Sequence, residues 1–338
     1  MAHTPGEIYF VRETVLGTDE LSPFVKIGLV AKERASAERL KEHQTGNPRR
    51  LFNQAVIKTD AVHRVEALMH RLFATHRVSG EWFKFETDGD LQSAISKAQE
   101  LSTEMASYMP VFRKAEELGQ VASIDGKILA PSNDIMQAVQ NYRESSLEVE
   151  MCDERIRLIG AKFREALDSG VDLQDVAKEK TISPVPKFNV TIFKKDHKET
   201  YDAFVIKNPT WAAKFSWLPP ALEPSDLSEE FLTEMLDIEA AIDEVESVED
   251  AYKLNEPLLR LTKLKALSEW KFDLAEAQIK VFCGDAEGIA GVCTWDRKAS
   301  TRAKFDEGKF AQEMPDLWLE YTLPRETYTR LTVARRQS

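Results

Sequence analysis

The sequence predicts an α+β protein with a small amino-terminal α/β unit, a mainly helical middle and a mixed α/β carboxy-terminal module. Short segments in which apolar and polar residues alternate occur near the amino end and again after Gly284, and such alternation is typical of strands. Between them, residues 90–180 and 225–267 repeat apolar residues at helical spacing. The 338 residues are enough for two or three domains, each with its own core.

The amino-terminal unit is predicted as a small three-stranded sheet with flanking helices. Residues 7–12 and 24–30 alternate like two strands of a hairpin. A helix follows and ends at Gly46 and Pro48, because glycine supplies a left-handed stop and proline cannot continue a helix. The remaining elements expected here are a strand at 51–59, a helix at 60–75 with Asp60 as its N-cap, and a short aromatic strand at 80–85.

The rest of the chain is predicted as helices followed by mixed structure. Residues 90–180 are helical with breaks near Pro110 and at 126–131, and residues 133–169 form one long helix or a helical hairpin. The prolines of Ser183-Pro-Val-Pro-Lys187 mark a boundary, because proline pushes the preceding residue out of helical conformation. Next come a β-rich piece at 188–206, an aromatic loop with Trp211 and Trp217, helix at 225–267, a hairpin at 288–295 and a strand at 328–333. We therefore expect three parts: 1–90, 91–182 and 183–338.

The charge is unevenly distributed along the chain, whose formal net charge is −12. Residues 25–84 contain 12 Lys and Arg against 6 Asp and Glu, so this segment is basic. Residues 226–256 carry 12 acids and a single base, Lys253, at a spacing that predicts a helix with its acids in water. A polyphosphate partner is therefore expected at the amino-terminal unit.

The sequence also indicates the cellular compartment and the state of the cysteines. The sequence has no run of 18 apolar residues and no basic leader with an apolar stretch behind it, so we expect a cytoplasmic protein without a membrane partner. Cys152, Cys283 and Cys293 form no Cys-x-x-Cys pair, which argues against a disulfide framework or a structural zinc site. They are expected to be reduced packing residues.

Five short motifs follow one another along the amino-terminal unit. They are Glu7-Ile8-Tyr9, Val25-Lys26-Ile27-Gly28, Arg39 to Pro48, Glu66 to Phe73, and Gly80-Glu-Trp-Phe83. With these motifs, residues 6–86 resemble the GIY-YIG endonuclease superfamily, and more closely its phage-associated branch that is often labelled a DNA-binding domain. The sequence departs from the namesake pattern, because Glu7 replaces the leading glycine and Lys26 replaces the second tyrosine.

The resemblance implies metal-dependent hydrolysis of a phosphodiester bond in DNA, which needs an activated water and stabilisation of charge on phosphorus and on the leaving oxygen. Tyr9 and Lys26 would handle the water, with the pKa of the phenol lowered by neighbouring cations. Arg39 would stabilise the transition state, since a guanidinium can hold two phosphate oxygens. Glu66 would bind Mg²⁺ or Mn²⁺, because these cations favour carboxylate oxygen, water and phosphate.

Two pairs of residues in the motifs lie four apart on their helices. Arg39 and His43 therefore share one helix face. For His43 three roles stay open: catalysis, contact with phosphate, or stabilisation of the helix C-terminus. Glu66 and His70 have the same spacing, which also fits a simple contact on the helix surface.

Further cations of this unit are predicted to contact the DNA backbone. They are not interleaved with aromatic residues, which favours phosphate contact over base reading, so we expect weak sequence selectivity. The residues predicted to bind DNA are Arg49, Arg50, Arg64, His70, Arg71 and Arg77. Because Lys26 replaces a tyrosine, a non-catalytic DNA-binding protein that uses the same cleft is an alternative to the endonuclease.

The carboxy-terminal part has motifs of its own: residues 275–279, 288–295, 305–310 and 330–333. They are similar to the tail that follows the nuclease core in YqaJ-type phage recombinase exonucleases, without the catalytic carboxylates and lysine of those enzymes. This resemblance implies an accessory module in a phage or prophage context, and a small cap without a special role is the alternative. A third hypothesis makes residues 91–338 a surface for homo-oligomerisation or for a partner in a phage recombination or defence complex.

Overall fold

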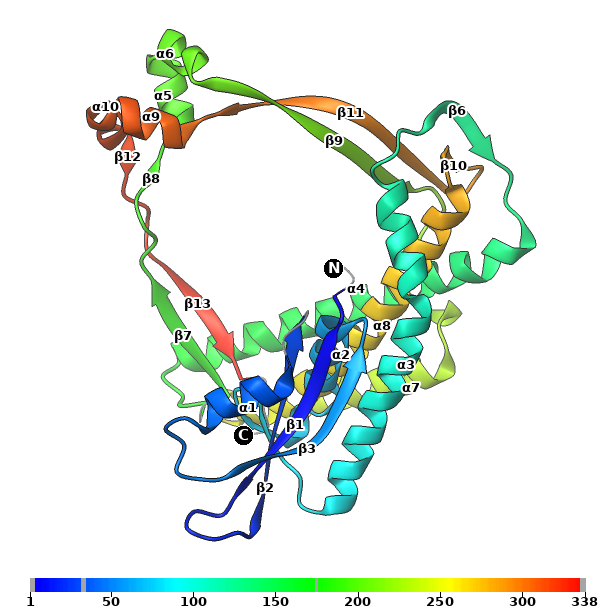
Figure 1. Ribbon diagram of the computed structural model, residues 1–338, viewed down its shortest axis with the longest axis vertical. Helices are drawn as coiled ribbons and strands as arrows, with labels where there is room; N and C mark the ends of the chain where they lie inside the picture. The colour runs from blue at the N-terminus through cyan, green and yellow to red at the C-terminus, as the bar shows by residue number, and fades with distance from the viewer. Residues whose placement is uncertain (1–3, 32–34, 174–175, 335–338) are drawn as a thin grey trace.

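The computed structural model describes residues 4–31, 35–173 and 176–334 and confirms the α+β fold class (Figure 1). Its amino-terminal unit contains the strands β1 (Gly6–Thr14), β2 (Leu21–Ala31), β3 (Leu51–Thr59), β4 (Arg77–Ser79) and β5 (Trp82–Lys84). They form one antiparallel sheet in the order β3-β1-β2-β5-β4. The three long strands are those that alternation predicted, and β5 is the short aromatic strand expected at 80–85. With β5 and the unpredicted β4, the sheet has five strands instead of the expected three.

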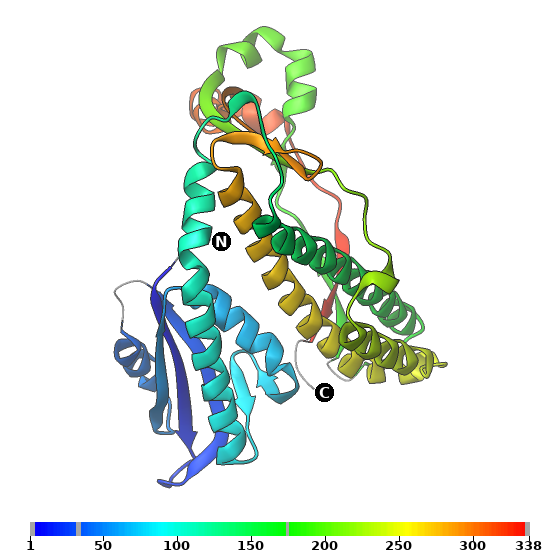
Figure 2. The same ribbon diagram turned by 90° about the vertical axis from the view of Figure 1, so that its right-hand side faces the viewer.

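Helices cover both faces of this sheet, because successive residues of a strand point to opposite sides. On one face, α2 (Val62–Leu72) and α3 (Asp88–Leu118) pack on Ile8 and Phe10 of β1. On the other face, α1 (Ser36–Gln44) places Leu40 against Tyr9 and Val11. Figure 2 shows α3 running along the sheet and continuing beyond it toward the carboxy-terminal part.

A helical body lies next to this sheet and shares its core. It consists of α4 (Asn133–Asp168), α7 (Glu229–Asp243), the 3-10 helix η3 (Val248–Leu254) and α8 (Asn255–Cys283). Ala266 and Trp270 of α8 are buried in the same cluster as the residues of β1 and β2. The predicted helix at 133–169 is a single helix, and α7 buries Phe231 and Met235 below its exposed acids, as expected. None of the helices in the described ranges has the length and apolar character of a membrane span.

The predicted break near Pro110 is wrong, because α3 continues through this proline. The proline removes one backbone donor, but Met105 and Met109 are buried in the core on the same helix. Pro110 itself faces solvent, where its ring displaces no packed side chain. Burial of Met105 and Met109 before the proline and of Ala115 after it therefore stabilises the helix where the local preference would interrupt it.

Two long β-ribbons and a small cap form an arch beside the body (Figure 1). The first ribbon pairs β9 (Val205–Trp217) with β11 (Cys293–Phe305) over 13 residues. At its root, β10 (Ala286–Ile289) and β6 (Ile124–Leu129) complete a four-stranded sheet in the order β6-β10-β11-β9. The second ribbon pairs β7 (Ala177–Ile182) with β13 (Tyr328–Val333), and it returns from the cap to the body.

The cap corrects the β-rich prediction for residues 188–206. It contains β8 (Lys187–Phe188), α5 (Val190–Asp196), α6 (Lys198–Ala203), α9 (Glu307–Glu313), α10 (Pro315–Glu320) and β12 (Thr322–Leu323). Asn189 caps α5 by accepting a hydrogen bond from the backbone N–H of Ile192 at 3.0 Å, so the aromatic run turns into a helix. Phe188, Phe193, Phe305 and Phe310 form the buried cluster of the cap.

The aromatic loop predicted at Trp211 and Trp217 is also wrong, because both residues lie in β9. Trp211 pairs with Ala299, and Trp217 pairs with Cys293. Pro209 is tolerated within this strand because β9 is an edge strand, where a missing N–H costs no ladder bond. The predicted hairpin at 288–295 and the strand at 328–333 are confirmed as β10–β11 and β13.

The arch makes the accessible surface unusually large. A compact protein of 38.4 kDa is expected to expose about 14,000 Å². The described structure exposes 19372 Å². The difference reflects ribbons that are solvated on both faces instead of being packed against a core.

Arg297 fixes the root of the first ribbon to the body. It is 1 % exposed and donates to the carbonyl oxygens of Leu118 and Ala286, each at 2.8 Å. Its guanidinium carbon lies 3.8 Å from the ring centroid of Trp295. One cation therefore joins the end of α3, strand β10 and strand β11.

We predict that Arg297→Met lowers the free energy of unfolding by about 2–4 kcal/mol, because two buried carbonyl groups lose a charged donor. Urea titration followed by tryptophan fluorescence measures the change. Lys298→Met is the matched control at the neighbouring exposed position and is expected to change the free energy by less than about 0.5 kcal/mol. Equal effects of the two substitutions would contradict the role given to Arg297.

Candidate functional site

The register of β1 and β2 places Tyr9 and Lys26 on one face of the sheet. Tyr9 lies opposite Gly28, and Val11 lies opposite Lys26. Residues two apart on a strand point to the same side, so Tyr9, Val11, Lys26 and Gly28 share a face. This is the face that α1 covers, which brings Arg39 and His43 above the same two strands.

Tyr9 is buried and its ring lies over Gly28. A Cβ atom at position 28 would be 2.5 Å from the Tyr9 hydroxyl oxygen, so only glycine leaves room for the ring. The hydroxyl oxygen is 3.3 Å from Nε2 of His43. Arg39 also forms a hydrogen bond with Tyr9, and its guanidinium pairs with Glu42 at 2.8 Å.

The expected lowering of the Tyr9 pKa is wrong. Burial raises the pKa of this phenol, and the hydrogen bond with Arg39 opposes the increase without cancelling it. The negative charges of Glu81 and Glu66 act in the same direction as burial. Tyr9 is therefore a neutral phenol at physiological pH.

Glu81 is a residue of the cluster that sequence reasoning did not single out. Its carboxylate lies 2.9 Å from Nζ of Lys26, and the two side chains form an ion pair. Burial acts to raise the pKa of Glu81, but the hydrogen bond and positive charge of Lys26 outweigh it and the pKa is lowered. The sequence offered one indication of its role, because Glu81 lies inside the Gly80-Glu-Trp-Phe83 motif. In the structure this residue lies on the turn before β5, the strand that pairs with β2.

Glu66 lies at the edge of β2 with an unusual protonation equilibrium. Burial raises the pKa of its carboxyl group to about 7, and the nearby charge of Glu81 adds to the increase, while Arg77 opposes it. The carboxylate is 3.7 Å from Nε2 of His70. Glu66 therefore holds its proton to a higher pH than an ordinary glutamate does.

His70 is a structural partner of the sheet edge. Its Nε2 lies 2.8 Å from the carbonyl oxygen of Ile27, and because a carbonyl only accepts, this nitrogen donates. Burial lowers the pKa of His70, although the bond to Ile27 opposes the change, so the ring is neutral at pH 7. His70 therefore positions α2 at the sheet edge and brings no positive charge toward DNA.

Glu66 lines a cavity that faces the helical body, whereas Tyr9, Lys26, Arg39 and His43 are not among the residues that line it. The cavity of about 360 Å³ is lined on the amino-terminal side by Glu66, His70, Arg71 and Arg77 and on the body side by Asp153, Ile156, Leu259, Thr262, Lys265 and Glu269. Lys265 forms an ion pair with Asp153 and lies 3.7 Å from Glu269. The body residues carry no recognisable motif, so only the fold could reveal that they share this cavity.

The residues present fit a single hard cation at Glu66. Within the described ranges no three His, Cys, Asp or Glu side chains are grouped as a metal cluster. Mg²⁺ needs no such cluster, because it retains water and is commonly held by one or two carboxylates plus substrate phosphate. The pKa of Glu66 is raised first by burial and second by the charge of Glu81, and a divalent cation beside the carboxylate would oppose both effects.

Four arginines predicted to bind DNA form ion pairs within the chain. Arg49 pairs with Glu13, Arg50 with Asp19 at 2.7 Å, and Arg71 with Glu269 at 3.5 Å. Arg64 lies apart from the cluster: it pairs with Asp273 at 2.8 Å, its side chain is 13 % exposed, and its guanidinium lies over the ring of Phe112. Arg77 remains at the cavity beside Glu66.

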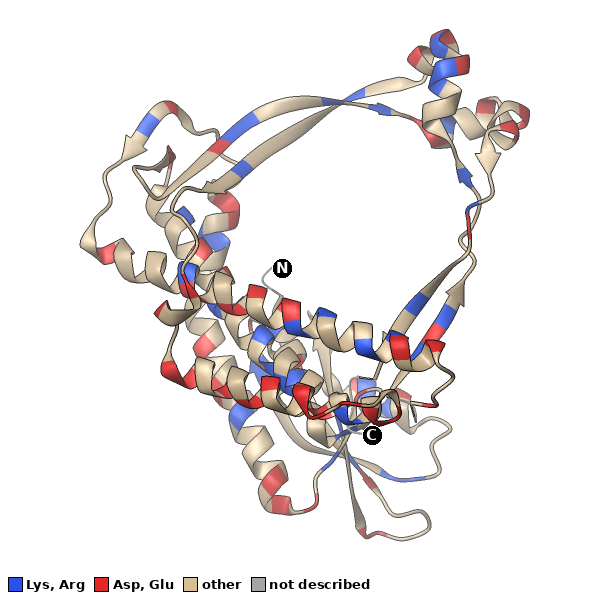
Figure 3. Cartoon of the chain, turned by 180° about the vertical axis from the view of Figure 1, so that it is seen from behind, with Lys and Arg blue, Asp and Glu red and all other residues tan. Residues whose placement is uncertain are grey.

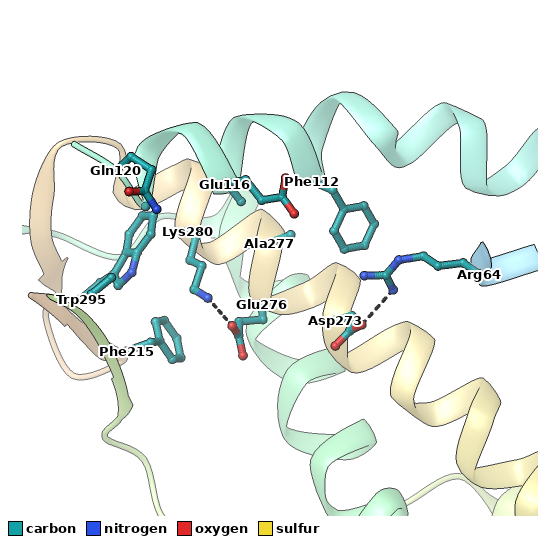
Figure 4. A pocket seen from close by; sticks show the side chains of 13 residues that line it. Arg64, Phe112, Glu116, Gln120, Phe215, Asp273, Glu276, Ala277, Lys280 and Trp295 are labelled. Atoms are coloured by element: carbon teal, nitrogen blue, oxygen red, sulfur yellow. Dashed lines mark hydrogen bonds and ion pairs between the residues drawn. The ribbon is translucent and has the colours of Figure 1, made fainter. Parts of the chain in front are cut away.

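Arg64 lines a second cavity of about 610 Å³ between α2, α3, α8 and the root of the first ribbon (Figure 4). Its two labelled cations are paired with carboxylates, Arg64 with Asp273 and Lys280 with Glu276. Phe112, Phe215 and Trp295 supply its aromatic wall. Both cations of this cavity already have a carboxylate partner, and Arg64 is largely buried, so we do not assign phosphate binding to it.

The departure at Glu7 from the namesake pattern has a structural role. The Glu7 carboxylate accepts a hydrogen bond from the backbone N–H of Ser36 at 2.8 Å. Ser36 is the first residue of α1, where backbone N–H groups have no partner within the helix. Glu7 thus ties α1, with Arg39 and His43, to the start of β1.

Comparison with known proteins agrees with the location of this cluster. Residues 6–99 match the family model described as T5orf172 domain, a family associated with GIY-YIG-like and phage endonuclease-type domains. No curated protein and no solved structure matches the chain. The match supports the coarser expectation of a phage-type nuclease-like or DNA-binding domain at the amino end.

We predict that Gly28→Ala displaces Tyr9 and lowers the free energy of unfolding by about 1–3 kcal/mol, since the new methyl group overlaps the phenol. Gly89→Ala is the matched control, because Gly89 lies in the first turn of α3 and its added Cβ approaches nothing closer than 3.5 Å. The control is expected to be neutral or slightly stabilising. Chemical denaturation of both variants measures the difference, and an equally mild effect at position 28 would show that Tyr9 does not lie over it.

A second prediction concerns pH and the metal-free protein. Because the pKa of Glu66 rises from 4.5 to about 7 on folding, stability is lost as pH rises through this window and stays low above it. Glu66→Gln removes this loss and is expected to stabilise the protein at pH 8 by about 3 kcal/mol, with little effect near pH 4. Melting temperatures at both pH values in EDTA test this, with exposed Glu38→Gln as the control. A constant difference across pH would exclude a raised pKa at Glu66.

Proposed function

We propose that the amino-terminal domain is a metal-dependent endonuclease that hydrolyses phosphodiester bonds in DNA. The observation that carries the proposal is the position of Glu66, a largely buried carboxyl group of α2 that lines an open cavity and whose charge acts on the pKa of Tyr9. Four elements, β1, β2, α1 and α2, contribute one or more side chains each. A shared phosphate-sized site is what in-line hydrolysis requires.

The residues divide the chemical task between them. Water attack forms a new P–O bond while the bond from phosphorus to the leaving sugar oxygen breaks, and the water gives up a proton. Tyr9 is protonated at neutral pH, so its oxygen accepts that proton only as its own moves to Nε2 of His43, 3.3 Å away. Arg39 offers two N–H groups to the charge that develops on phosphate oxygens.

Glu66 would hold Mg²⁺ or Mn²⁺, which when bound stabilises negative charge on the leaving oxygen. Lys26 is paired with Glu81 in the free protein, and this pair keeps the ammonium group directed into the site. An arriving phosphate offers Lys26 a second anionic partner. Lys26 then contributes positive charge at the site that a tyrosine in its place would not supply.

A non-catalytic DNA-binding function has specific support as the second candidate. The pKa of Tyr9 is raised and Lys26 is paired with Glu81, so the phenol is protonated at neutral pH and the ammonium group of Lys26 already has an anionic partner. The same cluster could then bind a phosphate without cleaving the bond. Binding and turnover must therefore be measured on the same variants.

We predict that the full chain cleaves supercoiled DNA in Mn²⁺ or Mg²⁺, and that Glu66→Gln slows cleavage by about 100-fold or more while leaving DNA binding in EDTA intact. Glu38→Gln, an exposed carboxylate of α1, is the matched control and should cleave like the wild type. Gel assays of cleavage and fluorescence anisotropy of binding give the two readouts. If the wild type binds DNA without cleaving it, the non-catalytic DNA-binding function replaces the endonuclease. If it neither binds nor cleaves DNA, both proposed functions are wrong.

A further inference from the structure

The ribbon of β9 and β11 is a basic element in an acidic chain. Its two strands carry six Lys and Arg and a single acid, Asp296, although the whole chain has a formal net charge of −12. Figure 3 shows these basic segments along the arch and acidic segments concentrated on the helical body. The bases come from two segments about 80 residues apart in sequence, and only their pairing brings them together.

The register sorts these charges onto one face. Lys298 lies opposite Ala212, Arg302 opposite Asn208, and Lys304 opposite Ile206. Because directly opposed residues share a face and side chains alternate along each strand, one face carries a row of bases and polar groups. This basic face consists of Lys214, Lys298, Arg302 and Lys304 with Asn208, Thr210 and Ser300 between them, and Asp296 near the root.

The assignment of faces is supported by a direct contact. Nζ of Lys298 lies 2.7 Å from the Asp296 carboxylate, two residues away on the same strand, which requires that both side chains point to one side. The opposite face carries Trp211, Pro209, Ala299 and Ala303, with Lys207 as its exposed base. The ribbon is therefore two-faced, with the cations gathered mainly on one side.

The exposed part of the ribbon is held at both ends. At the root, Cys293 and Trp295 are buried against α4 and α8, and Phe215 and Trp217 pack on the same cluster. At the far end, Phe305 is buried in the cap with Phe188 and Phe310. Residues 298–304 between these anchors are exposed without interruption. An isolated two-stranded ribbon is marginally stable in water, so the two anchors pre-organise this one.

We propose that the basic face of the β9–β11 ribbon docks into a groove of double-stranded DNA and contacts its phosphates. The two strands of a ribbon lie about 4.8 Å apart, and the major groove of B-form DNA, about 12 Å wide, admits such a pair. Lys298, Arg302 and Lys304 span about 20 Å at 3.4 Å per residue, which places cations along the groove walls over several base pairs.

The geometry selects duplex DNA over the other polyanions and over a second copy. The deep, narrow major groove of A-form RNA does not admit side chains, so it excludes a ribbon of this width. The acidic α7 of another molecule is a helix with acids spread around its exposed surface, and it offers no groove for a ribbon. The choice of DNA rests on the proposed function, whereas the ribbon as a contact surface stands on its own charge and shape.

The test is binding of a labelled 20-base-pair DNA duplex by the full chain in EDTA, measured by fluorescence anisotropy between 50 and 300 mM salt. The variant replaces Lys298, Arg302 and Lys304 with glutamine. Each lost phosphate contact reduces the slope of log affinity against log salt by about 0.9, so the expected reduction is about 2.7. Affinity at 100 mM salt should fall by about 100-fold.

The matched control replaces Lys114, Lys253 and Lys271 with glutamine, since these exposed lysines of α3, η3 and α8 give the same change in net charge. It should bind like the wild type. Loss of affinity in the ribbon variant alone supports the proposal, and equal loss in both would reduce it to an effect of net charge. Unchanged affinity and slope in the ribbon variant would overturn it.

Three further arms separate the alternatives. Arg39→Ala in the cleavage assay tests the amino-terminal site. Loss of binding in the ribbon variant without loss of cleavage in Arg39→Ala would sink the proposed function and leave the ribbon proposal standing, and the reverse result would do the opposite. An RNA duplex bound as tightly as DNA, with the same loss in the ribbon variant, would contradict groove selection. Light scattering at 50 mM salt detects self-association. If the wild type forms dimers that the ribbon variant does not form, and the variant still binds DNA, the basic face binds a second copy of the chain instead of DNA.

Discussion

The backbone of Ile27 is the point on which the candidate site depends. Its carbonyl oxygen accepts from Nε2 of His70, and its N–H donates to the carbonyl oxygen of Glu81 at 3.0 Å. The first bond docks α2 one turn away from Glu66, and the second fixes the turn that carries the Glu81 carboxylate. A buried carbonyl left without a partner costs about 1–3 kcal/mol, so His70 holds this edge in place. The two carboxylates are thereby brought close enough for the charge of Glu81 to raise the pKa of Glu66.

Most ion pairs of the arginines around this site are exposed and weak, so a phosphate group can replace the carboxylate partner at little cost. Arg50 pairs with Asp19, and Arg71 with Glu269, at positions that water reaches. Exposed pairs of this kind contribute about 0–1 kcal/mol, whereas a guanidinium can bind a phosphate through two charged hydrogen bonds. These arginines therefore lose little when they exchange a carboxylate for DNA. Arg64 differs, because it is largely buried over Phe112 and leaving that place would also cost packing.

Local sequence predicted the amino-terminal unit because its strands alternate cleanly and its turns carry glycine and proline. It could not reveal Glu81, since the ion pair with Lys26 depends on how β5 registers against β2. Tertiary packing overrode local preference at Pro110, where buried methionines carry the helix onward. At Trp211, pairing with Ala299 of a strand far along the chain made a strand from an expected loop. The basic face of the ribbon was not predicted either, because its basic residues come from two distant segments that only strand pairing brings together.

Helix α8 connects the two surfaces that these arguments identify. Glu269 lines the cavity beside Glu66, and Lys280 lines the cavity at the root of the ribbon. Eleven residues of helix separate them, which corresponds to about 16 Å at 1.5 Å per residue. Because α8 packs against α4 and shares the core of the amino-terminal sheet, this distance is fixed by a rigid element. The root of the ribbon is therefore held at a set distance from the Glu66 cavity, while the basic face is the side of the ribbon opposite to the one that packs on α4 and α8.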